Sequence, residues 1–181
     1  MSYSMRNLPK VMILDRDGTL IEHVHHLVDP MKVALLANVG QVLRSFSDRG
    51  VKFVVVTNQS VIERGLASVH LVGEIHRVID NLLLEFGVRI EAYYVCPHLA
   101  STSCLCRKPR IQHGLSILQD FSIQPSDVWV IGDQESDMEF ANNLGSTGIK
   151  ISASSSSESS VASMEFKSWS DFHLSTQKEF W

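Results

Sequence analysis

Two carboxylates, Asp15 and Asp17, stand two residues apart, after the short apolar run that begins at Lys10 and before Gly18. Side chains at this spacing can converge on one metal ion and one phosphorus atom, with Asp15 attacking the phosphorus while Mg²⁺ neutralises the approaching anions. Asp17 would protonate the leaving oxygen and then activate water against the phospho-aspartate. The alternative is an ordinary Asp-Gly turn after a strand. The pair therefore favours phosphate-ester hydrolysis, provided that other segments supply the partners this chemistry needs.

Two further segments could hold the phosphoryl group. Thr57 follows the apolar run FVVV, and a hydroxyl with backbone N–H groups at a strand end can bind phosphoryl oxygens. In Arg107-Lys108-Pro109, Lys108 can lie as a compact cation against the phosphate and Asp15, while Arg107 can chelate a second anionic group. The alternatives are ordinary polar loop residues and a solvated basic turn.

A second pair of carboxylates, Asp133 and Asp137, follows the apolar run VWVI. Asp133 is placed to bind Mg²⁺ through oxygen, the ligand type that this cation prefers. Asp137, one helical turn further on, could hold the metal's waters or the Lys108 ammonium from the second shell. Alternatively, Asp133 caps the following helix and Asp137 is solvated.

Three cysteines and one histidine lie within eleven positions, at Cys96, His98, Cys104 and Cys106. A disulfide would leave one thiol over, and two cysteines as close as Cys104 and Cys106 bridge poorly. Three sulfurs and one nitrogen make the ligand set of a closed tetrahedral Zn²⁺ site, which is structural rather than catalytic. Zinc would pin the loop 96–106 directly before the basic pair. The alternative is a group of reduced thiols beside a loop histidine.

Alternating strand and helix patterns predict a parallel sheet with helices on both faces. The expected strands are 10–14, 51–56, 90–95, 128–131 and 147–151, and the expected helices are 38–49, 68–86, 111–121 and 135–144. Asp15, Thr57 and Asp133 each come directly after an apolar strand run. Because such sheets bind ligands at the carboxyl ends of their strands, we expect these three residues to meet at one edge.

Composition narrows the class of protein. The 181 residues carry a net charge of −4, which gives no support for nucleic-acid binding, and fit one domain over 1–151. A Ser-rich linker is expected at 152–163, followed by an aromatic segment at 164–181 that packs on the domain or on a partner chain. No apolar run approaches the length of a membrane span, and residues 1–10 lack the core of a secretory signal. We therefore predict a cytoplasmic protein, with a monomer as the expected state.

Together and in this order, the chemical segments resemble the haloacid dehalogenase (HAD) superfamily of phosphohydrolases: DxDGT, a strand-end Thr, a Lys and GDxxxD. The resemblance covers roughly residues 10–151 and implies a Rossmann-like α/β fold with Asp15 as nucleophile and Asp17 as acid and base. It also implies that Mg²⁺ is bound by Asp15, the Asp17 carbonyl and Asp133, and that Thr57 and Lys108 hold the transferring phosphoryl group. An Asp two residues after the nucleophile favours phosphatase over dehalogenase chemistry.

The segments CPH and CLCRKP, with DRDGT and TNQS, look like the subfamily of histidinol phosphatases and heptose-bisphosphate phosphatases. Members lack a large cap domain and act on small phosphorylated metabolites. The segment TNQSVIERG is similar to the branch acting on D-glycero-D-manno-heptose 1,7-bisphosphate, which implies contacts to the sugar or its second phosphate from Asn58, Ser60, Arg64 and Arg107. The five-residue gap between His98 and Cys104 is the shorter type found in histidinol-phosphatase domains.

Some positions depart from the heptose branch. Val61 stands where that branch usually has Gly, Leu20-Ile21 replaces its usual Ile-Asn, and the histidines of the run 23–26 receive no role. The leading hypothesis is a heptose 1,7-bisphosphate 7-phosphatase. The alternatives are a histidinol-phosphate phosphatase, a phosphatase for another small metabolite, and a zinc-pinned binding module that has lost activity. Intact Asp15, Asp17, Lys108 and Asp133 argue against the last.

Overall fold

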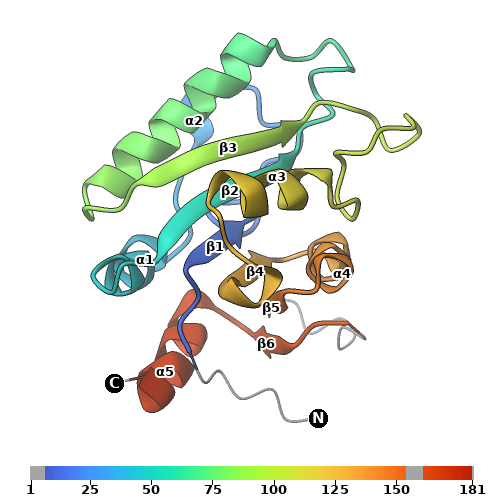
Figure 1. Ribbon diagram of the computed structural model, residues 1–181. Helices are drawn as coiled ribbons and strands as arrows, with labels where there is room; N and C mark the ends of the chain where they lie inside the picture. Colours follow the sequence, from blue (N-terminus) through green and yellow to red (C-terminus); the bar gives the residue numbers. More distant parts are fainter. Residues whose placement is uncertain (1–6, 154–160, 181) are drawn as a thin grey trace.

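A computed structural model describes residues 7–153 and 161–180 of the chain (Figure 1). Six parallel strands form one sheet in the order β3-β2-β1-β4-β5-β6. The strands are β1 (Val11–Leu14), β2 (Lys52–Asn58), β3 (Ile90–Cys96), β4 (Val128–Gly132), β5 (Thr147–Ile151) and β6 (Met164–Phe166). This is the predicted class of fold, a parallel sheet between helices.

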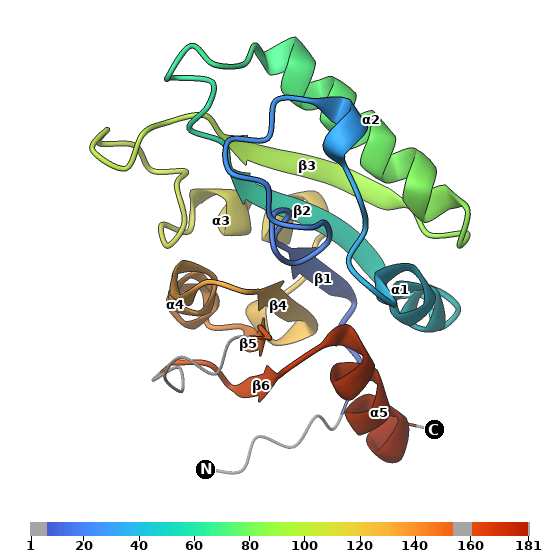
Figure 2. The same cartoon turned by 180° about the vertical axis from the view of Figure 1, so that it is seen from behind.

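Helices cover both faces of the sheet (Figures 1 and 2). They are α1 (Val39–Ser47), α2 (Val69–Leu84), α3 (Gln112–Asp120), α4 (Glu135–Leu144) and α5 (Trp169–Phe180), with short 3₁₀ turns η1 (Pro30–Lys32) and η2 (Pro125–Asp127). Helices α1, α2 and α5 pack on one face, and α3 and α4 pack on the other. Because both faces are covered, the strands read as continuous apolar runs rather than alternating ones.

The central strand shows how the two cores divide. Met12 and Leu14 of β1 point into the core under α1 and α2, whereas Val11 and Ile13 point into the core under α3 and α4. All four side chains are at most 1% exposed. Full burial of such a side chain contributes about 1.5–3 kcal/mol, so β1 is anchored on both sides before its chain reaches the polar residues that follow.

Local signals fix the helix ends near their predicted positions. The Ser68 hydroxyl accepts a hydrogen bond from the Leu71 N–H at 3.1 Å and caps α2. Gly145 ends α4 in the left-handed conformation, with φ of 78°. The helices therefore begin and end within a few residues of the ranges that the sequence predicts.

The sheet extends beyond the predicted boundary at residue 151. The sequence analysis assigns no strand there, yet β6 pairs with β5, and α5 packs against α1. Trp169 is 2% exposed and its Nε1 donates to the Thr19 carbonyl at 2.8 Å, while Phe172 stacks on Phe46 at 5.6 Å between ring centroids. A three-residue strand was too short to recognise, and most of the predicted Ser-rich linker, residues 154–160, lies outside the described residues.

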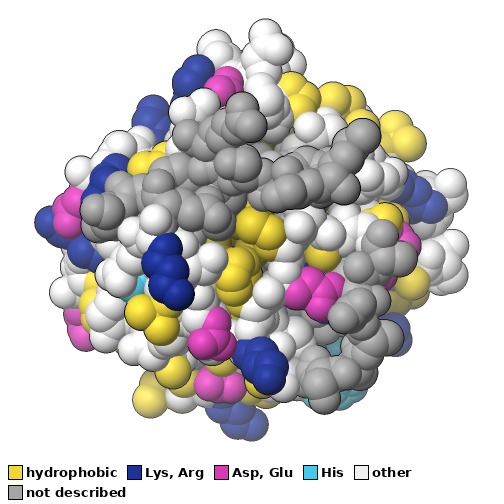
Figure 3. Space-filling model, turned by 90° about the horizontal axis from the view of Figure 1, so that it is seen from below, with side chains coloured by type: hydrophobic (Ala, Val, Ile, Leu, Met, Phe, Trp, Pro, Cys, Tyr) yellow, Lys and Arg dark blue, Asp and Glu magenta, His cyan; other side chains and the backbone are white. Residues whose placement is uncertain are grey.

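The connections that the structure describes carry no large cap domain. Between β1 and α1 the chain forms only a loop with the single turn η1, and this loop runs over the carboxyl ends of the strands (Figure 2). On the face that holds β6 and α5, the visible Lys and Arg side chains are scattered among acidic and hydrophobic ones (Figure 3). Within residues 7–153 and 161–180, no helix has the length and apolar character of a membrane span.

Candidate active site

A buried lysine organises the site. Lys108 is 5% exposed, and its Nζ lies 2.6 Å from Asp15 Oδ1, 2.7 Å from Asp137 Oδ1 and 2.7 Å from the Val56 carbonyl oxygen. The three partners come from the end of β1, the first turn of α4 and the end of β2. The sheet therefore brings together residues that are up to 122 positions apart in the sequence, from Asp15 to Asp137.

In this cluster, burial and charge pairing shift the pKa values of Asp15 and Lys108 in opposite directions. Burial raises the pKa of Asp15 to about 6, although Lys108 pulls that pKa downward. Burial disfavours the charge on Lys108, but Asp137 and Asp15 outweigh it, so the pKa of Lys108 lies above its usual value. Lys108 consequently stays charged at neutral pH and can compensate negative charge on Asp15 and on a bound phosphate.

Three carboxylates are arranged for a divalent cation. Oxygen atoms of Asp15, Asp133 and Asp137 lie within 4.8 Å of one another. Among the described residues, Asp133 Oδ1 is buried without a hydrogen-bond partner, and burial raises the pKa of this carboxyl. Gly18 has φ of 82°, and a Cβ at that position would lie 2.5 Å from Asp133 Oδ2. The oxygen set, the orphaned atom and the space kept by Gly18 fit a hard cation such as Mg²⁺.

Asp17 is oriented by two residues that the sequence analysis did not single out. Arg16 is 1% exposed and donates from Nε and Nη2 to the two Asp17 oxygens, at 3.0 and 2.9 Å. Gln59 Nε2 donates to Asp17 Oδ2 and to Thr57 Oγ1, both at 2.8 Å. The bidentate pair and the amide fix the orientation of the carboxylate. The middle letter of DRD and the third letter of TNQS were the available signals.

Residues at the end of β2 divide into two groups. Thr57 is 1% exposed and lines the cavity described below, as does Ser60. Asn58, predicted to contact substrate, also lines the cavity, but its amide is engaged by the Lys108 backbone. Asn58 Oδ1 accepts from the Lys108 N–H at 3.0 Å, and Nδ2 donates to the Lys108 carbonyl at 3.3 Å. Asn58 thus joins β2 to the lysine loop.

These residues surround an open cavity of about 420 Å³, a volume in the range of small-molecule sites. Its wall includes Asp15, Arg16, Asp17, Thr57, Asn58, Gln59, Ser60, Arg107, Lys108 and Asp137, together with the histidine loop around His23, His25 and His26. Arg64, predicted to contact substrate, is exposed and is not part of the wall. The three histidines are part of it, although the sequence analysis assigned them no role.

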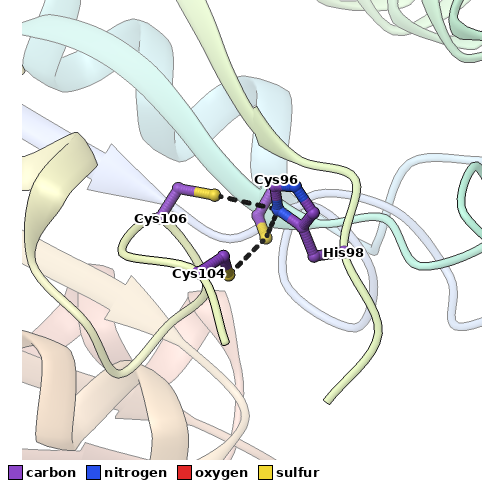
Figure 4. A group of neighbouring side chains, drawn as sticks. All are labelled: Cys96, His98, Cys104 and Cys106. Atoms are coloured by element: carbon purple, nitrogen blue, oxygen red, sulfur yellow. Dashed lines mark hydrogen bonds between the residues drawn. The ribbon is translucent and has the colours of Figure 1, made fainter. Parts of the chain in front are cut away.

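The second predicted metal site also comes together (Figure 4). Cys96 Sγ lies 3.5 Å from His98 Nδ1 and 3.8 Å from Cys104 Sγ, and His98 Nδ1 lies 3.3 Å from Cys106 Sγ. Tetrahedral coordination with Zn–S of about 2.3 Å and Zn–N of about 2.0–2.1 Å requires edges of roughly 3.8 Å between sulfurs and roughly 3.5 Å between sulfur and nitrogen. The donor set and its spacing therefore fit one Zn²⁺ ion.

The sulfur cluster holds the loop that carries the lysine. Cys96 ends β3, and Cys106 stands two residues before Lys108. Arg107 Nη1 donates to the His98 carbonyl at 3.0 Å. From the neighbouring loop, the Glu63 carboxylate accepts hydrogen bonds from the Leu99 N–H and from the Thr102 hydroxyl. These contacts fix both ends of a segment with no helix or strand of its own.

Comparison with known proteins shows which family has a similar sequence and fold. Residues 105–172 match the model of the HAD-hydrolase-like family. A probable D-glycero-D-manno-heptose-1,7-bisphosphate 7-phosphatase of Thermoplasma volcanium is 32% identical over 75% of this chain and 93% of its own length. The histidine biosynthesis bifunctional protein HisB of Legionella pneumophila is 33% identical over 80% of this chain, which spans only 42% of that protein.

A solved structure has the same fold. The D,D-heptose 1,7-bisphosphate phosphatase of B. bronchiseptica, complexed with magnesium and phosphate, superposes with a TM-score of 0.84 at 22% identity, over 94% of this chain and 99% of the other. A strand-end acid pair, a buried lysine and a third strand-end carboxylate on this fold define a phosphohydrolase of the HAD class. The chain belongs to the HAD-like phosphatases, in the family that includes the D-glycero-D-manno-heptose-1,7-bisphosphate 7-phosphatases.

Proposed function

We propose that this protein removes the 7-phosphate of D-glycero-D-manno-heptose 1,7-bisphosphate through an aspartyl-phosphate on Asp15. One observation carries the hydrolytic part: the Asp15–Lys108–Asp137 array lies on the wall of a cavity large enough for a small sugar phosphate. The choice of sugar is supported by the Thermoplasma volcanium relative, which this chain matches over 93% of that protein's length.

The residues would act in two half-reactions. In the first, an Asp15 oxygen forms a bond to phosphorus as the ester P–O bond breaks, and Asp17 gives its proton to the departing sugar oxygen. In the second, Asp17 takes a proton from water, the water oxygen bonds to phosphorus, and the P–O bond to Asp15 breaks. Inorganic phosphate leaves and both carboxyl groups return to their starting states.

Other groups hold the phosphoryl oxygens and the acid. Lys108 and the Thr57 hydroxyl stabilise the charge that develops on the transferring group. Arg16 and Gln59 keep Asp17 oriented. Asp15, Asp133 and the Asp17 carbonyl would hold Mg²⁺, which would supply positive charge against the phosphoryl oxygens. At the sulfur cluster, the four protein ligands would hold Zn²⁺ in a structural role, because they would leave no open position for substrate.

A second candidate is histidinol phosphate. It is favoured by the similarity to HisB and by the five-residue gap between His98 and Cys104. A histidinol site needs an acidic partner for the substrate amine, whereas the cavity wall, as the described residues form it, has no carboxylate besides Asp15, Asp17 and Asp137, which the chemistry already uses. We therefore place the heptose bisphosphate first. A cytoplasmic location and a monomeric state stay predictions.

The deciding experiment is phosphate release in Mg²⁺ from heptose 1,7-bisphosphate and histidinol phosphate under matched conditions. We expect kcat/KM to be at least about tenfold higher for the bisphosphate, which corresponds to about 1.4 kcal/mol of transition-state discrimination. A preference for histidinol phosphate would overturn the choice of sugar, while turnover of neither by an enzyme that hydrolyses p-nitrophenyl phosphate would restrict the proposal to the class of reaction.

A further inference from the structure

The loop that joins β2 to α2, residues 59–68, begins with a residue that orients the acid of the active site. Gln59 is 4% exposed, and its Nε2 donates to Asp17 Oδ2 and to Thr57 Oγ1, both at 2.8 Å. Because one amide bridges these two groups, a displacement of Gln59 would change the orientation of the Asp17 carboxylate. The position of this loop therefore affects the chemistry.

Two backbone hydrogen bonds join the β2–α2 loop to the loop 96–106, which carries the sulfur cluster. The Gln59 N–H donates to the Cys96 carbonyl at 2.7 Å, and the Glu63 N–H donates to the Pro97 carbonyl at 3.3 Å. Within the β2–α2 loop, the Ile62 N–H donates to the Gln59 carbonyl at 3.2 Å. A tight turn thus connects Gln59 to Glu63, and both ends of this turn contact the loop 96–106.

The Glu63 side chain connects the two loops at a further point. Its carboxylate accepts a hydrogen bond from the Leu99 N–H, and each of its oxygens lies 2.9 Å from the Thr102 hydroxyl. Both partners lie in the five-residue gap between His98 and Cys104, in a segment without helix or strand. Hydrogen bonds to an ionised acceptor are stronger than those between neutral groups, so this exposed carboxylate holds the segment against the turn.

We propose that Glu63 is a positioning residue for the general acid. By joining the β2–α2 loop to the loop 96–106, Glu63 keeps the Gln59 amide against Asp17, and small displacements of such groups are costly in catalysis. Glu63 is not part of the cavity wall, so it acts on the reaction through Gln59. The inference rests on the proposed phosphatase function, but it does not depend on which sugar is the substrate.

The dependence of the rate on the leaving group reports the acid specifically. p-Nitrophenolate is a weak base that can depart without a proton, whereas phenolate is a stronger base and gains more from the proton that Asp17 gives. The ratio of kcat/KM for phenyl phosphate to that for p-nitrophenyl phosphate therefore measures how well Asp17 acts as an acid. Displacement of Lys108 or loss of zinc would lower both values alike, because both substrates transfer the same phosphoryl group.

The chain offers variants that separate these effects. Glu63→Ala removes the carboxylate from an exposed position, and Glu63→Gln keeps one acceptor oxygen. The matched control is Glu74→Ala, because the Glu74 carboxylate pairs with Arg77 within α2 at 2.8 Å. Gln59→Leu removes the amide itself. Zinc content and thermal unfolding check that each variant is loaded and folded.

The ratio is then compared among these variants. We expect Glu63→Ala to lower it about fivefold, Glu63→Gln to lower it by less, and Glu74→Ala to leave it unchanged. Gln59→Leu should lower the ratio about 20-fold. Adding Glu63→Ala to Gln59→Leu should lower it no further, because the two residues act through one contact. An additional loss in the double variant would overturn the proposal.

The same measurements separate this inference from the proposed function. The wild-type rate on p-nitrophenyl phosphate, and its loss in Asp15→Asn, tests the class of reaction. If the wild type hydrolyses both aryl phosphates, an unchanged ratio in Glu63→Ala, or an equal loss on both substrates, would overturn the positioning role alone. A ratio that falls in both Glu63→Ala and Gln59→Leu at full zinc content would support it.

Discussion

The carboxylate cluster around Lys108 and the sulfur cluster around His98 lie on either side of one short segment, and they are supported in opposite ways. Asp15, Asp133 and Asp137 stand at the ends of strands or in the first turn of a helix, so the sheet fixes their backbone. Cys104 and Cys106 lie in a loop without regular structure, as does His98.

In the carboxylate cluster the fold positions the ligands, whereas in the sulfur cluster the bound metal would stabilise the fold of the loop. Two apolar cores position the carboxylates, and removal of a hard cation would leave those cores intact. Cys96 shares this support at the end of β3, but Cys104 and Cys106 do not, and binding energy at a zinc site of this type is also folding energy. Lys108 connects the two, because bound zinc would order its loop while Asp15 and Asp137 pair with its charge.

The largest expected effect is a loss of catalytic activity in a variant that keeps its fold. Asp15→Asn removes the nucleophile, so we expect kcat on p-nitrophenyl phosphate to fall by on the order of 10³-fold or more. Thermal unfolding should shift little, because Lys108 keeps its pair with Asp137. The matched control is Asp48→Asn, at a surface carboxylate paired with Arg44. Retained turnover in Asp15→Asn would exclude the aspartyl-phosphate.

Lys108→Met tests the residue that joins the two regions. It leaves Asp15 and Asp137 close together without a cation, and breaking a buried pair in this way costs about 3–5 kcal/mol. We expect a marked loss of stability in urea and a loss of activity of about 10²-fold. If the variant lost activity alone and kept its full stability, the charge balance in this cluster would be less important than the structure indicates.

Cys106→Ser removes one sulfur ligand and tests the other side of the comparison. We expect metal analysis to find less than one zinc per chain and the unfolding temperature to fall by about 5–10 °C, from a loss of about 2–3 kcal/mol. Activity should fall through displacement of Lys108, and added Mg²⁺ should not restore it.

Asp133→Asn is the converse variant. We expect it to lose activation by Mg²⁺ and to keep its zinc and its stability.

A smaller expected effect is the dependence of folding stability on the ionisation of His76. Burial, with a contribution from Arg16, lowers the pKa of His76 to about 4, from an ordinary value of about 6.5. Since the unfolded chain binds this proton first, stability should fall as pH drops from about 6.5 toward 4, by on the order of 1 kcal/mol at pH 5.5. His76→Phe, which keeps an aromatic ring against Tyr93, should flatten this part of the stability profile. A profile that is as steep as in His70→Gln, a variant at an exposed histidine of α2, would assign the loss to other groups.

The alternation of elements and the motif positions were readable because their signals are local. Apolar runs such as Val11–Leu14 are buried on both faces, and Ser68 caps its helix through a hydrogen bond to a residue three positions away. The reaction class followed from strand-end residues, because parallel strands place their carboxyl ends at one edge. The strand β6 was missed because three residues carry too little periodic signal.

What the sequence determined by itself was which residue types follow each strand, and hence a phosphate-handling site and a four-ligand metal cluster. Only the tertiary structure decided how these side chains are shared. In the folded chain, the Asn58 amide hydrogen-bonds to the Lys108 backbone, and Asp17 accepts hydrogen bonds from Arg16 and Gln59. The histidine loop lines the cavity wall, whereas Arg64 does not. The physical reason is that hydrogen-bond partners and burial depend on where distant segments meet in space, which no short stretch of sequence encodes.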